Sequence, residues 1–255
     1  HFQFQMNAYV TGTTNSHQRV KKPDFLHLTI LFPEKNIRDK IGNLHSRLRR
    51  KLVTNKKITE YCSGYISYLY RSWFIDFDPV KAKAKGKLPY GMGENTAALF
   101  PDTLEDSEIG PIPTGWAVGT IHDIAKQRKD TVRPDDFGDM TPYIGLEHMP
   151  RKSIALTEWG GSAGLNSNKF RFDKRDILFG KLRPYFHKVG PAPLDGVCST
   201  DILVIQPIDD ELGGFLLPIL SSENFVNFVS GISEGVGLPR TKWDHFKLYK
   251  IALPP

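Results

Sequence analysis

A run of 41 residues without proline, from Glu34 to Phe74, constrains the fold of this chain more than any other feature. Apolar side chains recur in it at alternating four- and three-residue spacing, and the polar residues Lys51 and Asn55 occupy two intervening positions of the same register. Such a stripe predicts one long helix of the coiled-coil type, which packs along a narrow face against a partner helix. At about 1.5 Å per residue the helix would reach roughly 60 Å, so we expect it to protrude or to pair. The stripe consists of Ile37, Ile41, Leu44, Leu48, Ile58, Cys62, Tyr65 and Leu69.

The first part of this run is strongly basic. Between Glu34 and Glu60 there are nine Lys and Arg residues against three acidic residues, so this segment alone carries +6, which equals the formal net charge of the whole chain. A basic balance is compatible with nucleic-acid binding but does not require it. A solvated helix with a basic face would explain the charges equally well, whereas the length of the run favours a spacer.

The sequence predicts an α+β fold in four segments. Residues 1–33 hold short apolar runs and end in a strand-like stretch, and residues 34–78 form the long helix, which ends because Pro79 disfavours a helical conformation in Asp78. Residues 79–110 are Lys-rich, then Gly-rich, then acidic, as in a linker. Residues 111–255 have the composition of a globular mixed α/β domain, which we expect to be built on a curved sheet with several short helices.

Short apolar runs between turn residues mark the elements of this last domain. Predicted strands are Trp116–Thr120, Tyr143–Leu146, Ser153–Leu156, Asp176–Leu182, Phe186–Val189, Ile202–Ile205 and Leu248–Leu253, and the stretch Leu26–Pro33 is strand-like too. Predicted helices are Leu212–Leu220 and Glu223–Val229, with one helical turn at Thr241–Phe246.

Composition excludes several classes of protein. No stretch reaches the roughly 18 unbroken apolar residues of a membrane span. The two cysteines, Cys62 and Cys198, are too few for a disulfide framework and are typical of a reducing cytoplasm. The chain begins with His1 and stops at Pro255, directly after a strand-like run, so we expect it to be part of a longer reading frame.

Five residues near the start of the chain recur near its end at a constant offset of 221 positions. Each copy follows a loop rich in small residues and ends in an apolar run closed by proline. This agreement indicates a duplicated domain whose first copy is represented only by its tail, although two strand ends can also agree by chance. The pairs are Arg19 and Arg240, Lys21 and Lys242, Phe25 and Phe246, Ile30 and Ile251, and Pro33 and Pro254.

Two clusters and one loop have the chemistry of a DNA-binding surface. Arg and Lys neutralise phosphates or bind guanine edges, and Tyr can stack or form hydrogen bonds. A solvated strand edge, a tight turn and an ordinary surface loop are the respective alternatives. The first cluster is Lys181, Arg183, Tyr185, His187 and Lys188; the second is Ser233, Arg240, Lys242 and Trp243; the loop, Trp159–Lys169, contributes Ser162, Asn166, Ser167, Asn168 and Lys169.

LYRSWFIDFDPVKAKAKG and NTAALFPDTLEDSEIGPIPTGW are long runs that resemble the centre of the DNA specificity (S) subunits of type I restriction-modification systems, where a long conserved helix leads into the second target-recognition domain. DKRDILFGKLRPYFHKVGPAPLDGVCSTDILVIQP resembles the recognition-domain signature, and GVGLPRTKWDHFKLYKIALPP resembles the C-terminal element.

This resemblance implies a non-catalytic, cytoplasmic protein of bacteria or archaea with sequence-specific affinity for double-stranded DNA. Residues 1–33 would be the tail of the first recognition domain and residues 111–255 the second, each domain reading one half of a split target. Methyltransferase (M) and restriction (R) subunits would be the partners, with no role for a membrane. S-adenosylmethionine, ATP and Mg²⁺ would belong to those partner subunits, so no cofactor is expected here. The apolar stripe would pack against a second long helix, and the M subunits would dock around the pair.

Motifs for catalysis are absent from the sequence. It has no adenine-methylation motif, no Gly-rich methyl-donor loop after a strand and no phosphate-binding loop of a motor ATPase. The His and Cys residues lack the spacing of a metal site, and Cys198 is more simply a buried strand residue than a nucleophile. Two alternatives stay open. One is the recognition segment of a fused restriction-methylation enzyme whose catalytic domains lie upstream, and the other is a coiled-coil adaptor that does not bind DNA.

Overall fold

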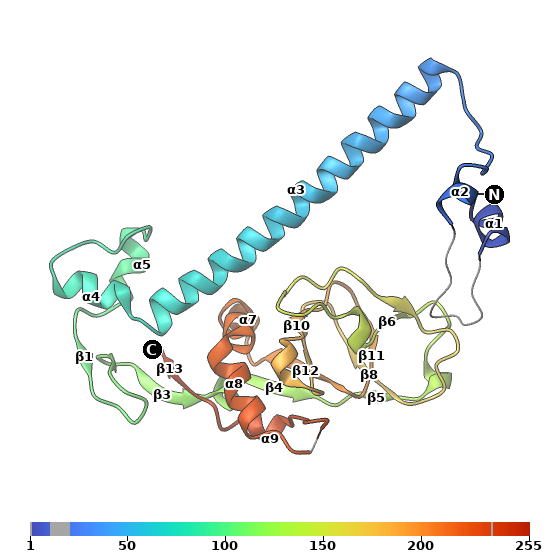
Figure 1. The fold of residues 1–255 in the computed structure, drawn as a ribbon. Coiled ribbons are helices and arrows are strands. Elements are labelled where there is room, and N and C mark those ends of the chain that lie inside the picture. The colour runs from blue at the N-terminus through green and yellow to red at the C-terminus, as the bar shows by residue number, and fades with distance from the viewer. Residues whose placement is uncertain (1, 11–20, 236) are drawn as a thin grey trace. The chain divides into compact units, whose positions relative to one another are not determined.

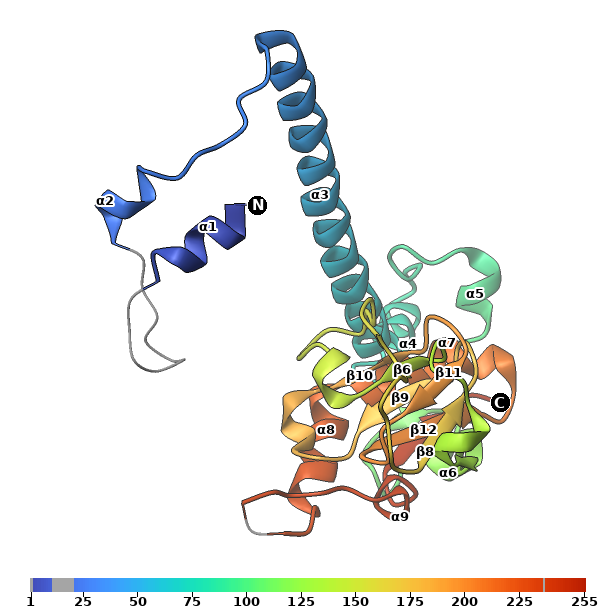
Figure 2. The same ribbon diagram turned by 90° about the vertical axis from the view of Figure 1, so that its right-hand side faces the viewer.

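The computed structural model describes residues 2–10, 21–235 and 237–255 (Figures 1 and 2). By their internal contacts the residues form two units, 1–57 and 58–255, and each is described by itself. The fold is of the mixed α+β class, as predicted, with one long helix and several small, mainly antiparallel sheets.

In the first unit, helix α1 (Phe2–Ala8) and the single turn α2 (Lys22–Phe25) precede an extended stretch. The side chain of Gln5 bonds both main-chain groups of Thr29, at 2.8 and 2.9 Å. The expectation of a strand at Leu26–Pro33 is wrong, because no strand among the described residues pairs with this stretch. Its apolar side chains are accordingly exposed, Leu31 to 93%.

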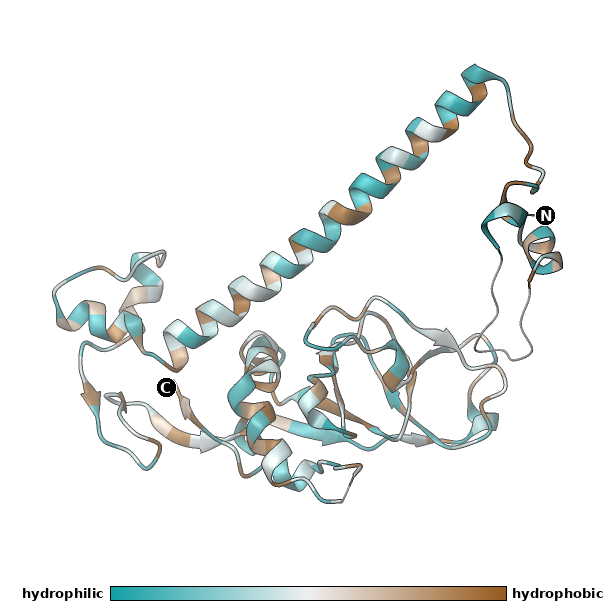
Figure 3. Cartoon of the chain, viewed as in Figure 1, coloured by the Kyte–Doolittle hydropathy of each residue, from teal (hydrophilic) through white to brown (hydrophobic). Residues whose placement is uncertain are grey.

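Helix α3 (Lys35–Phe74) has 40 residues and confirms the long helix predicted from the apolar stripe. Its predicted end at Asp78 is wrong, because the helix ends at Phe74 and Asp78 is the first residue of the next helix, where proline is tolerated in the first turn. Figure 3 shows apolar positions recurring along its length between hydrophilic ones. The stripe residues Ile37, Ile41, Leu44, Leu48 and Ile58 are each at least half exposed, and Leu69 is partly buried. The buried residues of this helix, Tyr70 and Ser72, lie near its C-terminal end.

An aromatic cluster joins the end of α3 to the segment that follows. Phe74 lies 5.9 Å from Trp116 between ring centroids, and Phe100 lies 5.7 Å from the same ring. The segment 79–110, expected to be a linker, contributes helices α4 (Asp78–Ala84) and α5 (Glu94–Ala98) and strand β1 (Leu104–Glu105), which pairs with β2 (Ile112–Pro113). The Nζ of Lys83 donates to the carbonyl of Ala97 at 3.1 Å, so α4 and α5 are held together.

The central sheet has four antiparallel strands in the order β10-β9-β12-β4. Helices α7 (Gly213–Ser221), α8 (Glu223–Gly231) and α9 (Trp243–Phe246) bury their apolar faces against it, with Phe179, Phe225 and Phe246 fully buried together. The predictions of these three helices are confirmed. The strands are β4 (Ala125–Arg128), β9 (Ile177–Gly180), β10 (Val189–Pro191) and β12 (Ile202–Pro207).

A second sheet has the order β5-β8-β11-β6-β7, in which only the β11–β6 pair is parallel. Alternate side chains of β12 pack into two different hydrophobic cores, because successive side chains point to opposite faces of a strand. Leu203 and Ile205 belong to the core beneath the helices, whereas Ile202 and Val204 belong to the core of the second sheet. The strands are β5 (Thr131–Val132), β6 (Pro142–Ile144), β7 (Gly160–Gly161), β8 (Lys169–Phe172) and β11 (Gly196–Cys198).

The remaining elements are short. Strand β13 (Lys250–Leu253) pairs with β3 (Ala117–Thr120), which confirms both predicted strands. The predicted strand Ser153–Leu156 is wrong, since these residues form no ladder, and Phe186–Val189 begins as a 3-10 turn instead. The other short elements are helix α6 (Ile121–Ile124) and the 3-10 turns η1 (Pro134–Asp136), η2 (Leu146–His148), η3 (Pro184–Phe186) and η4 (Asp210–Leu212).

The two copies of the sequence repeat share one feature of structure. The single turn α2 (Lys22–Phe25) corresponds to α9 (Trp243–Phe246) at the same offset of 221 residues. Arg19 lies outside the described residues. Beyond this turn the copies differ, because Ile251 is buried in β13 while Ile30 is 60% exposed in an unpaired stretch.

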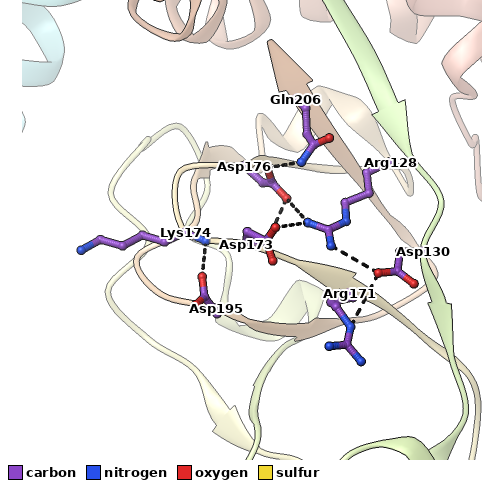
Figure 4. A network of polar contacts seen from close by, with 8 residues as sticks. All are labelled: Arg128, Asp130, Arg171, Asp173, Lys174, Asp176, Asp195 and Gln206. Atoms are coloured by element: carbon purple, nitrogen blue, oxygen red, sulfur yellow. Dashed lines mark hydrogen bonds and ion pairs between the residues drawn. The ribbon is translucent and has the colours of Figure 1, made fainter. Parts of the chain in front are cut away.

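A network of charged side chains fastens β4 to the turn before β9 (Figure 4). The guanidinium of Arg128 contacts the carboxylates of Asp130 at 3.2 Å and Asp176 at 3.4 Å, and also that of Asp173. Asp176 is buried, and it accepts further bonds from the amide of Gln206 at 3.0 Å and from the main chain of Asp173 at 2.9 Å. These carboxylates raise the pKa of Arg128 against the opposing effect of burial. The positive charge of Arg128 is therefore neutralised by ion pairs within the fold.

No single helix in the described part of the chain is long and apolar enough to cross a membrane. Residues Asp210–Ser221 and Glu223–Gly231 meet that criterion only jointly, as a pair bent by 63°.

Candidate nucleic-acid interface

The two basic clusters of the sequence lie side by side in the structure. Lys181 follows β9, and its main-chain N–H donates to the carbonyl of Asp201 at 2.8 Å. On its other side, the N–H of Thr241 donates to the carbonyl of Lys181 at 3.0 Å, and Leu182 forms a β-bridge with Arg240. We name Lys181, Arg183, Arg240 and Lys242 the basic cluster. It lies where the C-terminal end of β9 meets the N-terminal end of β12.

Two carboxylates are paired with cations of the basic cluster. Nη2 of Arg240 lies 3.1 Å from Oδ1 of Asp201, and the amine of Lys242 pairs with Glu234. The side chain of Arg240 is 59% exposed and that of Lys242 is 55% exposed. Because four cations face two carboxylates, the cluster retains net positive charge at the surface.

Lys181 and Arg183 are partly buried members of the cluster. The Nζ of Lys181 donates to the carbonyl of Thr200 at 2.6 Å and lies 5.0 Å from the ring centroid of Phe170, and burial lowers its pKa. Arg183 has a left-handed backbone, with φ of 50°, and its Nη2 reaches the carbonyl of Gly237 at 3.4 Å. Its Nε is buried without a partner among the described residues. Both side chains therefore hold the cluster together as well as adding charge.

The other members of the first predicted cluster have different surroundings. Tyr185 is 46% exposed and contacts the ring of Phe186 edge-on at 4.9 Å. The amine of Lys188 donates to the carbonyl of Leu146, and burial lowers the pKa of that amine. Burial also lowers the pKa of His187. Lys188 is thus directed towards Leu146, whereas the exposed Tyr185 is free to meet a ligand.

Ser233 and Trp243, two members of the second predicted cluster, form contacts inside the fold. The hydroxyl of Ser233 donates to the carbonyl of Val229 at 2.5 Å, which caps the end of α8. Trp243 is partly buried, with its ring 5.8 Å from that of Phe246. These contacts fix the segment that carries Arg240 and Lys242.

The Trp159–Lys169 loop divides into anchoring residues and exposed residues. Ser162 is buried and donates to the carbonyl of Gly138 at 2.6 Å. Lys169 is only 5% exposed, and its amine donates to the carbonyl and the hydroxyl of Ser167 at 2.7 and 2.6 Å. Asn166, Ser167 and Asn168 are exposed. The exposed residues therefore form the part of the loop that a ligand can reach.

Several residues at this surface were not predicted from the sequence. Asp201 and Glu234 pair with the cluster, and Arg151 stacks on the ring of Phe186 with its Cζ 3.7 Å from the centroid. The signal of Asp201 and Arg151 in the sequence is weak, because each depends on a partner far away in the chain. Glu234 is only eight residues from Lys242, so their opposite charges were a local signal. Cys198, near Asp201, is confirmed as a buried strand residue, and burial raises the pKa of its thiol to about 12. A thiol with this pKa stays protonated at neutral pH and is a poor nucleophile.

Comparison with known proteins connects this surface to a family. Residues 113–255, which include the whole basic cluster and the loop, match the family described as "Type I restriction modification DNA specificity domain". The chain belongs to this family. No group of three or more His, Cys, Asp or Glu side chains in the described part of the chain could hold a metal ion.

Curated relatives agree with this assignment. The chain is 36% identical over 164 residues to the HindI specificity subunit of Haemophilus influenzae, which covers 48% of this chain and 36% of that protein. It is 24% identical over 177 residues to the EcoDI specificity subunit of Escherichia coli, covering 63% of this chain and 37% of that protein. A specificity subunit of Methanocaldococcus jannaschii, MjaIX, is also 24% identical, over 158 residues. The matches thus cover about a third of the length of each of these relatives.

Two solved structures align along the whole of this chain. One is the HsdS subunit from Thermoanaerobacter tengcongensis, with 14% identity, a TM-score of 0.40 and 55% of that chain covered. The other concerns "complex assembly and conformational transition of the type I R-M system", with 14% identity, a TM-score of 0.38 and 56% of that chain covered.

Proposed function

We propose that this chain binds double-stranded DNA in a sequence-specific way, as part of the specificity subunit of a cytoplasmic type I restriction-modification complex. The observation that carries the proposal is the basic cluster, which lies within the residues that match the family. Two stretches of chain about 60 residues apart meet there and place four cations on one surface, where only two carboxylates oppose them. Excess positive charge at an exposed edge is what binding to DNA phosphates requires.

Within this surface, we assign positioning and sequence reading to different groups. Phosphate contacts fix where a protein lies on a duplex, whereas contacts to base edges discriminate between sequences. Arg240 and Lys242 have counterparts in the sequence repeat, and domains that read different half-sites share backbone contacts more readily than base contacts. We therefore assign Arg240 and Lys242 mainly to phosphates. Base reading falls to the loop, where Asn166 and Ser167 are exposed, while Lys181 and Arg183 serve either role.

The same proposal assigns target recognition and catalysis to different subunits of the complex. Residues 111–255 would be one target-recognition domain that reads one half of a bipartite target, and residues 1–33 would be the tail of another. Methyl transfer, ATP hydrolysis and DNA cleavage would reside in M and R subunits, together with S-adenosylmethionine, ATP and Mg²⁺. A fused enzyme, the alternative, would carry an adenine-methylase motif upstream of His1. The curated relatives favour the separate subunit, because each is itself a specificity subunit.

The direct test is the binding of duplex DNA by this chain over a range of salt concentrations. We expect weak affinity with little sequence preference, because one recognition domain reads only one half-site. The affinity should fall steeply as salt rises, since each phosphate contact releases condensed counterions. Binding that is absent, or that does not respond to salt, would contradict the proposal.

Helix α3 would act as the docking and spacing element. Its stripe residues, Leu44 among them, expose apolar surface along a narrow face that suits a partner helix. In the full-length subunit, Leu44→Asp should abolish co-purification with the M subunit, because pairing would bury an uncompensated charge. Asp39→Asn, a change on the same helix outside the stripe, is the matched control and should leave the yield unchanged. Co-purification of the Leu44→Asp protein at the wild-type yield would exclude this role.

The spacing role has a separate test. A four-residue helical insertion near Asn55 should shift the preferred separation of the half-sites by about 6 Å of helix axis. Selection of bound duplexes with different spacers would measure the shift.

A further inference from the structure

A carboxylate, that of Asp201, lies within the basic cluster, where it opposes the binding of phosphate. Its Oδ1 is 3.1 Å from Nη2 of Arg240. Burial lowers the pKa of Lys181, and the negative charge of Asp201 offsets only part of that effect. The side chain of Asp201 is 34% exposed, so it borders the same solvent from which a duplex would approach.

The architecture of the cluster does not depend on this carboxylate. Main-chain hydrogen bonds already tie the segments together, from Lys181 to Asp201 at 2.8 Å and from Thr241 to Lys181 at 3.0 Å. An ion pair as exposed as Asp201–Arg240 contributes little to stability. The main physical effects of the carboxylate are therefore to restrict the orientation of one guanidinium and to compete with phosphate for it.

We propose that Asp201 is a positioning residue that holds Arg240 in one orientation and lowers the affinity of the basic cluster for DNA of arbitrary sequence. This inference rests on the DNA-binding function proposed above. A phosphate that binds Nη2 of Arg240 must displace the carboxylate, which offsets part of the gain from counterion release. The pair uses Nη2, so other N–H donors of the guanidinium stay available to a phosphate that arrives in the matching position.

The test compares two variants of this chain that each lose one negative charge. Asp201→Asn should bind a mixed-sequence duplex about three- to tenfold more tightly at low salt, with a salt slope steeper by up to about 0.9, because one more phosphate is fully engaged. Asp244→Asn is the matched control. Asp244 lies nearby on α9, but its carboxylate pairs with Lys247 at 2.8 Å and not with the basic cluster. The control should change the affinity less than about twofold, as expected for a screened surface charge.

Two further variants separate a positioning role from a general change of charge. In an Arg240→Ala background, Asp201→Asn should change the affinity less than about twofold, as in the control, because the guanidinium that it releases is gone. Asp201→Glu, which keeps the negative charge, should bind DNA with nearly the affinity of the unsubstituted chain. Equal effects of Asp201→Asn and Asp244→Asn, or an effect of Asp201→Asn that persists without Arg240, would overturn the proposed role of Asp201. Either result would leave the proposed DNA-binding function intact. If the unsubstituted chain has no salt-sensitive affinity for DNA, the proposed function falls as well.

Discussion

Two regions of the same domain are rich in arginine and aspartate, and they use these residues in opposite ways. In the Arg128 network one guanidinium faces the carboxylates of Asp130, Asp173 and Asp176, and its side chain is only 19% exposed (Figure 4). In the basic cluster four cations face two carboxylates, and the side chain of Arg240 is 59% exposed.

The difference shows that the ratio of charges and the degree of burial distinguish a structural arginine from one that is available to a ligand. The guanidinium of Arg128 pairs with three carboxylates of the fold, so a phosphate could bind it only by displacing these ion pairs. Arg240 has one carboxylate partner among the described residues, and its side chain is 59% exposed. The first region should therefore respond to substitution in stability, and the second in DNA affinity.

The largest effect should come from Arg128→Ala, which would leave the buried carboxylate of Asp176 without its cation. We expect a loss of about 2–4 kcal/mol in the free energy of unfolding, somewhat below the cost at a fully buried pair because Arg128 is partly exposed. Urea denaturation would measure it. Arg171→Ala is the control, since the side chain of Arg171 is 48% exposed and its one ion pair among the described residues is with Asp130, at 3.6 Å. The free energy of unfolding should fall by less than about 1 kcal/mol in this variant. Equal losses in the two variants would refute the structural role of the network.

An intermediate effect is expected at the exposed part of the loop. Within the assembled methylase, Asn166→Ala should cost about 1–3 kcal/mol of binding free energy on cognate DNA and almost nothing on non-cognate DNA, because a base contact is specific to one sequence. Asn95→Ala, at the start of the distant helix α5, is a matched control. Titration of both duplexes would measure the difference. A uniform loss on the two DNAs would place Asn166 among the phosphate contacts instead.

The smallest effect should come from Arg240→Ala. This variant should bind cognate and non-cognate DNA more weakly by a similar factor, with a salt slope shallower by about 0.9, because one phosphate contact is lost. Its unfolding free energy should change by less than about 1 kcal/mol, since the ion pair with Asp201 is exposed. Salt titrations and urea denaturation on the same preparation test both statements. A loss confined to cognate DNA would mean that Arg240 reads a base.

The two copies of the repeat show why sequence pattern predicted some elements and missed others. The single turn is present in both copies, because it depends on local residues. The strand is present only in the second copy, where β13 has β3 as a partner. Phe246 is fully buried beneath α8, whereas its counterpart Phe25 is 52% exposed. Identical residues thus have different environments when the elements that cover them differ.

The missed strands have the same explanation. Strand β4 contains Lys126, Gln127 and Arg128, which have no apolar alternation, and it is a strand because β12 offers it four residues of ladder. Conversely, Ser153–Leu156 was predicted as a strand but forms no ladder with any segment that the structure describes. Strand formation depends on hydrogen bonds to another segment, so a local pattern cannot decide it.

The sequence by itself determined the long helix, the helices over the central sheet and the resemblance to the specificity subunits. Helical hydrogen bonds join residues four apart, and a run of residues without proline with a regular apolar stripe already contains what such a helix needs. The sequence also contained the cations of the candidate interface, but as two unrelated clusters and a loop. Only the tertiary structure placed Lys181 beside Arg240, directed Lys188 to Leu146, buried Lys169 and set Asp201 against Arg240. These relations join residues far apart in the chain, and charge interactions fall off with distance and solvent exposure, which the fold alone defines.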